Sequence, residues 1–178
     1  MIETEIVMWL QQALAGPAAD ALASMLSIRG APAMLSGLCV LPLLLSDRHR
    51  RAGILILAAV AAVYLVNELG VKPLLMRPRP FEACPEILLI GSMPSGFSFA
   101  STHSAVLFAT ATAVILTSDR RYGALLFALA VSVAILRVYA GVHYPSDVIA
   151  GAAMGVIAAV LLVVAFHPSL RDGGTETA

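Results

Sequence analysis

Long stretches without a charged residue place the strongest constraint on how this chain can fold. Five such stretches are rich in Ala, Leu, Val and Ile, and each approaches the roughly 20 residues that a helix needs to cross a bilayer. Their length favours helices over strands. The predicted spans are residues 30–46, 52–71, 101–118, 122–140 and 147–166, of which the second extends past Glu68, the fourth extends past Arg137 and the fifth begins at Asp147. We therefore expect one all-α domain over residues 1–178, a polytopic transmembrane helix bundle of five to six spans.

The composition excludes most other classes of protein. Of the 178 residues, 60% are hydrophobic and 12% are charged, and the mean hydropathy is +0.91. A disordered chain needs low hydrophobicity and high charge. A nucleic-acid-binding protein needs an excess of basic residues, whereas Lys plus Arg and Asp plus Glu both number 11 here. A soluble enzyme of this size could not cover so much apolar surface. The expected surroundings are therefore a lipid bilayer, with no nucleic-acid partner.

Residues 1–28 differ from the five predicted spans. Gly16-Pro17 divides them, and Trp9 is of the residue type favoured at a membrane interface. We expect two short interfacial helices here, with a sixth, imperfect span as the alternative. The segment begins with acidic residues and lacks the basic region of a cleavable signal peptide.

Basic loops indicate the orientation of the bundle. The loop after the first predicted span carries Arg48, Arg50 and Arg51, and the loop after the third carries Arg120 and Arg121. With five spans, both loops and the C-terminus fall on one side, which the positive-inside rule makes cytoplasmic. Residues 72–100 and 141–146 then share the outer face of a cell membrane.

Three polar clusters lie at the ends of predicted spans on this outer side, at residues 72–80, 99–104 and 137–147. In a chain with so little charge, ionisable groups near membrane depth are functional candidates. Besides Arg77, the clusters contain three cations, two histidines and a carboxylate, namely Lys72, Arg79, Arg137, His103, His143 and Asp147. Cations at this density suit a phosphate or a similar oxyanion. Two histidines beside a phosphate can divide the roles of nucleophile and general acid.

The remaining polar residues of the clusters fit the same chemistry. Ser101 and Thr102 precede an apolar helix, and the free N–H groups of a helix N-terminus attract anions. Asp147 lies four residues after His143 and can fix its tautomer. The clusters contain no pair of carboxylates and no Cys/His spacing typical of a metal site. We therefore expect neither a metal nor another cofactor.

The order of these residues resembles the type 2 phosphatidic acid phosphatase family, the membrane relatives of the vanadium haloperoxidases. Lys72 followed by Arg79-Pro80 matches the first motif of that family, Lys-x6-Arg-Pro. Ala100-Ser101-Thr102-His103 stands where the family has Pro-Ser-Gly-His, so that Ser and His match. Arg137, His143 and Asp147 match the third motif, with Leu136 in place of Ser. The resemblance extends over residues 72–151.

The resemblance implies a haloperoxidase-like core and a lipid phosphatase that works without a metal, through a phosphohistidine. In this scheme His143 is the nucleophile, Asp147 orients its ring, and His103 protonates the leaving oxygen and then activates water. The remaining matched residues would hold the phosphoryl oxygens, namely Lys72, Arg79, Ser101, Thr102 and Arg137.

Four further sets of residues have expected roles outside the motifs or beside them. Glu68 lies four residues before Lys72 on one helix face and is expected to position it, the alternative being a carboxylate that reaches the interface. Arg77 is expected to be a solvated loop charge rather than a phosphate contact. Tyr139 and Tyr144 are expected to be interfacial aromatics. Gly151 and Gly155, in a Gly-x-x-x-Gly pattern, are expected to allow close helix packing within the bundle.

A phosphate site at the mouth of a membrane bundle predicts a lipid substrate. An isoprenoid diphosphate such as undecaprenyl diphosphate is preferred on the family resemblance. Phosphatidylglycerol phosphate, phosphatidic acid and lipid A phosphates remain open, as does phosphoryl transfer between lipids. A catalytically silent membrane scaffold is the alternative outside enzymes, and the intact set of cluster residues argues against it. The sequence leaves the oligomeric state open.

Overall fold

The computed structural model describes residues 2–28 and 30–166, and these residues form helices and loops without a strand. The predicted all-α class is confirmed. The helices follow in order: α1 Ile2–Ala13, α2 Pro17–Met25, α3 Ala31–Leu45, α4 Arg50–Val66, the π-helix η1 Asn67–Val71, α5 Lys72–Leu75, α6 Pro80–Ala83, α7 Thr102–Thr117, α8 Arg120–Tyr139 and α9 Pro145–Phe166. The cytoplasmic assignment of the C-terminus concerns residues outside those described.

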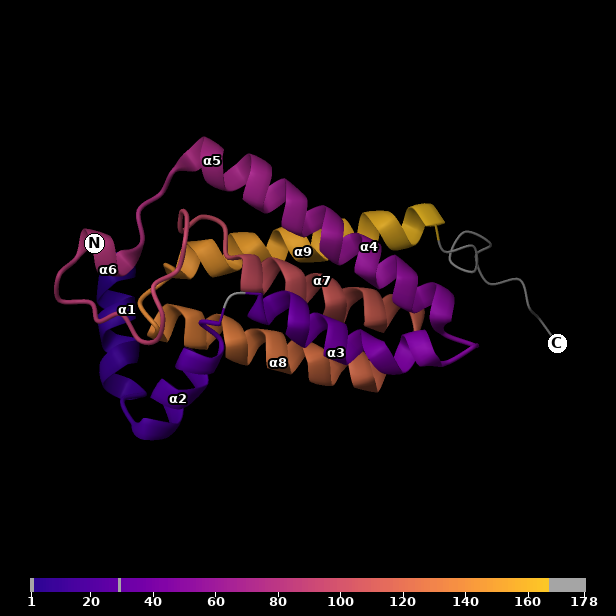
Figure 1. The fold of residues 1–178 in the computed structure, drawn as a ribbon, viewed down its shortest axis with the longest axis horizontal. Helices are drawn as coiled ribbons and strands as arrows, with labels where there is room; N and C mark the ends of the chain where they lie inside the picture. Colours follow the sequence, from indigo (N-terminus) through magenta and orange to yellow (C-terminus); the bar gives the residue numbers. More distant parts are fainter. Residues whose placement is uncertain (1, 29, 167–178) are drawn as a thin grey trace.

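The long helices α3, α4, α7, α8 and α9 run along one another, whereas α1 and α2 lie across one end of the bundle (Figure 1). Helix α7 forms the centre, since twelve of its sixteen residues are buried. It begins at Ser101, whose hydroxyl accepts the N–H of Ser104 at 3.5 Å. Helix α8 begins in the same way, with the Asp119 carboxylate accepting the N–H of Tyr122 at 2.8 Å.

The outer surface of the bundle is apolar, as a membrane protein requires. Three segments, Arg50–Ala83, Arg120–Tyr139 and Pro145–Phe166, are long and apolar enough to cross a bilayer, and α3 and α7 are shorter apolar helices. Large apolar side chains such as Leu45 and Leu125 are exposed on the outside of the bundle. In water these side chains would cost free energy, but lipid accepts them.

The two ends of the bundle differ in character. The basic loops between α3 and α4 and between α7 and α8 lie together at one end. The segments around residues 72–100 and 140–145 lie at the other end, together with α1 and α2 (Figure 1). The charged motif residues are therefore gathered at the end opposite the basic loops.

Two glycines of α9 allow it to pack closely against α7. A Cβ atom on Gly151 would lie 2.4 Å from the carbonyl oxygen of Ser101, and one on Gly155 would lie 2.2 Å from that of Ala105. No side chain larger than hydrogen fits at either position without moving backbone. The expectation of close packing within the bundle is confirmed, and this contact sets how near the third motif can come to the second.

Tyr139 and Tyr144 differ from their expected interfacial positions, because both are buried. The Tyr139 hydroxyl donates to Asp20 on α2 at 2.5 Å. The ring of Tyr144 lies under the guanidinium of Arg77, with 4.0 Å between the guanidinium carbon and the ring centroid. Tyr139 therefore connects the end of α8 to α2, and Tyr144 connects the segment before α9 to the loop that carries Arg77.

We predict that Gly155→Val destabilises the protein by about 1–3 kcal/mol, because the added carbons must displace the backbone of α7. Thermal unfolding in detergent measures this effect as a lower midpoint. Gly37→Val is the matched control, since a Cβ on Gly37 has no neighbour within 4 Å. Equal midpoints for the two variants would show that α7 and α9 are not held at this distance.

Candidate active site

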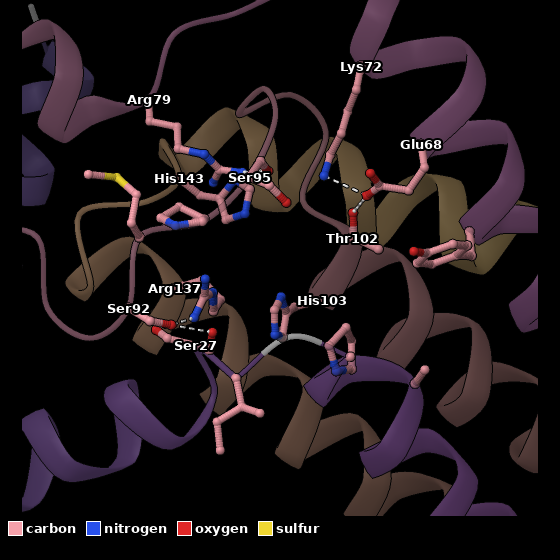
Figure 2. Close-up of a pocket in the computed structure, with 17 residues that line it drawn as sticks. Ser27, Glu68, Lys72, Arg79, Ser92, Ser95, Thr102, His103, Arg137 and His143 are labelled. Atoms are coloured by element: carbon pink, nitrogen blue, oxygen red, sulfur yellow. Dashed lines mark hydrogen bonds and ion pairs between the residues drawn. The ribbon is translucent and has the colours of Figure 1, made fainter.

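The three polar clusters meet in one cavity of about 370 Å³ at the end of the bundle covered by α1 and α2 (Figure 2). Both predicted catalytic histidines and all three predicted cations line it. The lining residues with polar side chains from the predicted set are Glu68, Lys72, Arg79, Thr102, His103, Arg137 and His143. Residues separated by up to 75 positions in sequence thus face a common space, and among the described residues three cations line it against one carboxylate.

Arg137 stands in the last turn of α8 and is only 3% exposed. Its Nη1 donates to the hydroxyl of Ser27 at 3.2 Å. Its Nε is buried and makes no hydrogen bond to any of the described residues. A buried N–H without a partner costs free energy, and a ligand that reached this nitrogen would recover that cost.

Arg79 lines the same cavity but already uses most of its donors. Its guanidinium donates to the carbonyl oxygens of Gly96 at 3.0 Å, Val142 at 2.9 Å, and Ser95 and Phe97 at 3.2 Å each. Four of its five N–H groups are thereby occupied. Arg79 fixes the loop before α7 against the loop before α9, and one Nη1 hydrogen remains for a phosphoryl oxygen.

Lys72, Glu68 and Thr102 form a connected group on the opposite wall (Figure 2). The Lys72 ammonium donates to Glu68 Oε1 at 2.6 Å, and the Thr102 hydroxyl donates to the same oxygen at 2.5 Å. The amide of Asn67 in turn donates to Thr102 Oγ1 at 3.0 Å. Glu68 therefore restrains the Lys72 ammonium, which keeps further donors for a ligand in the cavity.

His143 lies in the loop between α8 and α9 and is 3% exposed. Burial lowers the pKa of His143 to about 4, assisted by the positive charges of Arg79 and Arg137 and opposed by Asp147. The imidazole is therefore neutral near pH 7. Its Nδ1 lies 3.6 Å from Asp147 Oδ2, so that Nε2 is the nitrogen left for chemistry.

Asp147 is fully buried behind His143 and does not line the cavity. Its Oδ2 accepts the Ser98 hydroxyl at 2.5 Å and the Tyr144 N–H at 2.8 Å. Its Oδ1 accepts Arg77 Nη1 at 2.6 Å. These three donors compensate the buried charge and fix the orientation of the carboxylate toward the ring of His143.

Arg77 is not the solvated loop charge expected from the sequence. Its side chain is 27% exposed and pairs with Asp147 and with Glu3 of α1, each at 2.6 Å. Ser98 was not among the residues expected at the site. It carried no signal in the sequence that could have identified it.

His103 is at the start of α7 and lines the cavity. Its Nε2–H donates to the carbonyl oxygen of Leu26, at the end of α2, at 2.9 Å. Because a carbonyl only accepts, this contact assigns the hydrogen to Nε2 and leaves Nδ1 for proton transfer. The end of α2 thus sets the orientation of the second histidine.

Ser101 is not brought to the cavity wall. Its side chain is fully buried and caps α7, and its N–H donates to the backbone carbonyl of Asp147 at 2.9 Å. Pro94 and Ser95, from the loop that Arg79 holds, line the cavity instead. Within the described residues, no three or more His, Cys, Asp or Glu side chains are grouped so that they could hold a metal ion.

Comparison with known proteins gives a family match that includes all three polar clusters. Residues 51–171 match the model of the PAP2 superfamily. The chain is 33% identical over 113 residues to an undecaprenyl-diphosphatase of Sulfolobus acidocaldarius. This match covers 64% of this chain and 54% of the relative. It is 32% identical over 117 residues to the bacitracin transport permease protein BcrC of Bacillus licheniformis, covering 65% of this chain and 57% of that one. The chain therefore spans about half the length of the curated relatives it matches.

Two solved structures share the fold. The crystal structure of Aquifex aeolicus LpxE superposes with a TM-score of 0.77 and 24% identity, covering 92% of this chain and 96% of that one. The structure of a transmembrane PAP2-type phosphatidylglycerolphosphate phosphatase from Bacillus subtilis gives a TM-score of 0.70 and 20% identity, covering 98% of this chain and 87% of that one. The arrangement of helices is therefore shared over almost the whole chain.

We predict that histidine NMR of the protein in detergent finds the midpoint of His143 near 4. Arg137→Gln should raise this pKa, because removing a nearby positive charge favours the imidazolium. Arg48→Gln, which changes an exposed arginine of a distant loop, is the control and should leave the midpoint in place. A midpoint that does not rise in Arg137→Gln would contradict the charge coupling across the cavity.

Proposed function

Because the chain belongs to the PAP2 superfamily, we propose that it hydrolyses a phosphate or diphosphate monoester on a membrane lipid, through a phosphohistidine and without a metal. The observation that carries this proposal is the cavity itself, where two histidines from different helix ends meet three cations. Arg79 also holds loop carbonyls, but the buried Nε of Arg137 has no partner among the described residues, and such a group is costly in a structural scaffold. A phosphoryl group needs this combination of charge and nucleophile.

In the first step, Nε2 of neutral His143 attacks phosphorus and forms a P–N bond while the bond from phosphorus to the lipid oxygen breaks. His103 is protonated when the negatively charged phosphate is bound beside it, and it gives its Nδ1 proton to the leaving oxygen as the lipid product departs. Positive charge develops on the His143 ring during attack. Asp147 lies beside Nδ1 and stabilises that charge.

In the second step, His103 is neutral and accepts a proton from a water molecule that attacks the phosphohistidine. The P–N bond breaks, inorganic phosphate leaves, and His143 returns to its neutral form. Arg137, Lys72 and the remaining Nη1 hydrogen of Arg79 stabilise the phosphoryl oxygens in both steps. Fixed cations are effective here, because the loose transition state spreads its charge over those oxygens.

The preferred substrate class is an isoprenoid diphosphate such as undecaprenyl diphosphate. The support is the similarity to a relative named undecaprenyl-diphosphatase, together with a cavity whose walls join an apolar outer surface. Phosphatidylglycerol phosphate, phosphatidic acid and lipid A phosphates are the other candidates. A lipid acceptor in place of water would make the same site a phosphotransferase. We place the cavity on the outer face of the cell membrane, following the basic loops at the opposite end.

We predict that the wild-type protein in detergent releases phosphate from at least one lipid in a panel of these four classes. His143→Ala should reduce the rate by about 10³-fold or more, because the covalent step is lost. Turnover should survive thorough chelation of divalent metals. His49→Ala, which changes a histidine at the far end of the bundle, is the matched control. Full activity in His143→Ala, or complete loss on chelation, would refute the mechanism.

We predict that Glu68→Gln lowers kcat/KM by about tenfold, equivalent to ~1.4 kcal/mol, because Lys72 loses the charge that restrains it. The Gln side chain keeps an oxygen for Thr102, so the change isolates the ion pair. Glu86→Gln alters an exposed carboxylate of the loop and serves as the control. Kinetics of Glu68→Gln equal to those of the control would exclude a positioning role for Glu68.

A further inference from the structure

We propose that Glu3, on the N-terminal helix α1, is a positioning residue of the active site that acts through Arg77 on the carboxylate of Asp147. This inference rests on the proposed function, in which Asp147 supports the ring of His143. Glu3 lies outside residues 51–171, over which the chain matches its family model. The active site thereby depends on a helix that the three sequence motifs do not include.

Hydrogen bonds and ion pairs connect Glu3 of α1, Arg77 and the start of α9. Glu3 Oε2 accepts Arg77 Nη2 at 2.6 Å, and Glu3 Oε1 accepts the backbone N–H of Ser146 at 2.8 Å. Arg77 Nη1 donates to the Ser146 hydroxyl at 2.7 Å and to Asp147 Oδ1 at 2.6 Å. The Glu3 carboxylate thus binds the Arg77 guanidinium, which itself binds Asp147. It also binds the backbone N–H of Ser146, the residue before Asp147.

The surroundings make these contacts stronger than those of an ordinary surface ion pair. The side chains of Glu3 and Arg77 are 33% and 27% exposed, and that of Asp147 is fully buried. The ring of Tyr144 covers one face of the guanidinium. Burial opposes ionisation of Glu3, but the donors from Ser146 and Arg77 outweigh it and hold the pKa of Glu3 below its usual value. Glu3 is therefore charged at neutral pH.

The charges show why Arg77 needs a second carboxylate. Arg77 binds Oδ1 of Asp147, the oxygen on the side away from His143, while Oδ2 lies 3.6 Å from the imidazole. Arg77 could rotate about its long side chain if Asp147 were its single anionic partner. Glu3 holds the other end of the guanidinium, so Oδ1 is fixed and Oδ2 keeps its direction toward the ring.

Helix α1 has other attachments that do not involve Glu3, and these provide a control. Near its other end, the Gln11 amide donates to the carbonyl oxygens of Leu88 at 2.7 Å and Tyr139 at 3.0 Å. Val7, between the two ends, is fully buried. Loss of the Glu3 charge should therefore leave α1 in place, and loss of Gln11 should weaken α1 without altering Asp147.

The kinetic test compares Glu3→Gln, Arg77→Gln, Arg77→Lys and the double variant Glu3→Gln/Arg77→Gln, using the lipid phosphate that the wild type hydrolyses best. We expect Glu3→Gln to lower kcat by about three- to tenfold and Arg77→Gln by about 10²-fold, with KM within about twofold of the wild type. Arg77→Lys should recover part of the loss. In the Arg77→Gln background, Glu3→Gln should have a smaller effect than in the wild type, because its route to Asp147 through Arg77 is already broken and only its contact with the Ser146 N–H is left to lose.

Two control variants separate positioning from anchoring. Glu5→Gln changes an exposed carboxylate of the same helix turn and should leave kcat unchanged. Gln11→Leu should lower the thermal midpoint with kcat retained at temperatures where the protein is folded. The inference is overturned if Glu3→Gln matches Glu5→Gln in kcat, or if the effects of Glu3→Gln and Arg77→Gln are additive.

Hydrogen exchange of the backbone amides tests the contact independently of catalysis. We expect faster exchange at residues 144–148 in Glu3→Ala than in wild type, and no change in Glu5→Ala, because only Glu3 accepts the Ser146 N–H. Wild-type protein that releases no phosphate from any lipid would refute the proposed function, and this measurement would still decide whether Glu3 holds the segment. Equal exchange in wild type and Glu3→Ala would overturn the inference.

Discussion

The rest of the structure depends on one buried charge, the carboxylate of Asp147. A fully buried carboxylate is stable only when donors surround it, and its donors come from separate parts of the chain: Ser98 before α7, Arg77 after α5, and the Tyr144 backbone before α9. Satisfying this one group therefore brings all three polar clusters to the same end of the bundle. The glycines of α9 permit this arrangement, because they let α9 approach the start of α7 closely.

Two different features of the sequence allowed predictions, one of the all-α fold and the other of the residues that meet in the cavity. The apolar runs predicted helices because a bilayer leaves few alternatives for long uncharged segments, although the number that cross the membrane stays a prediction. The cavity residues were found because His103, His143 and the cations are rare in so apolar a chain. Neither signal depends on knowing how the loops pack.

The sequence did not predict which partner each polar side chain of the site binds. Arg79 matches a phosphate-binding motif, yet four of its N–H groups hold loop carbonyls. Arg77, two residues away, was assigned to solvent and instead binds Asp147. Ser101 caps α7, as its place before an apolar helix indicated, but it does not line the cavity as a phosphate contact would. Such assignments depend on loop conformation and on contacts with α1, which carry no periodicity or spacing that a sequence pattern could reveal.

Thr102 stands where the related motif has glycine, and its hydroxyl is shared between Glu68 and Asn67. Glycine at position 102 would leave the Glu68 carboxylate one donor short, and loss of that carboxylate would leave the Thr102 hydroxyl without its acceptor in a residue that is 6% exposed. The effects of substitutions at positions 68 and 102 should therefore be non-additive, so that the two positions behave as one unit of variation.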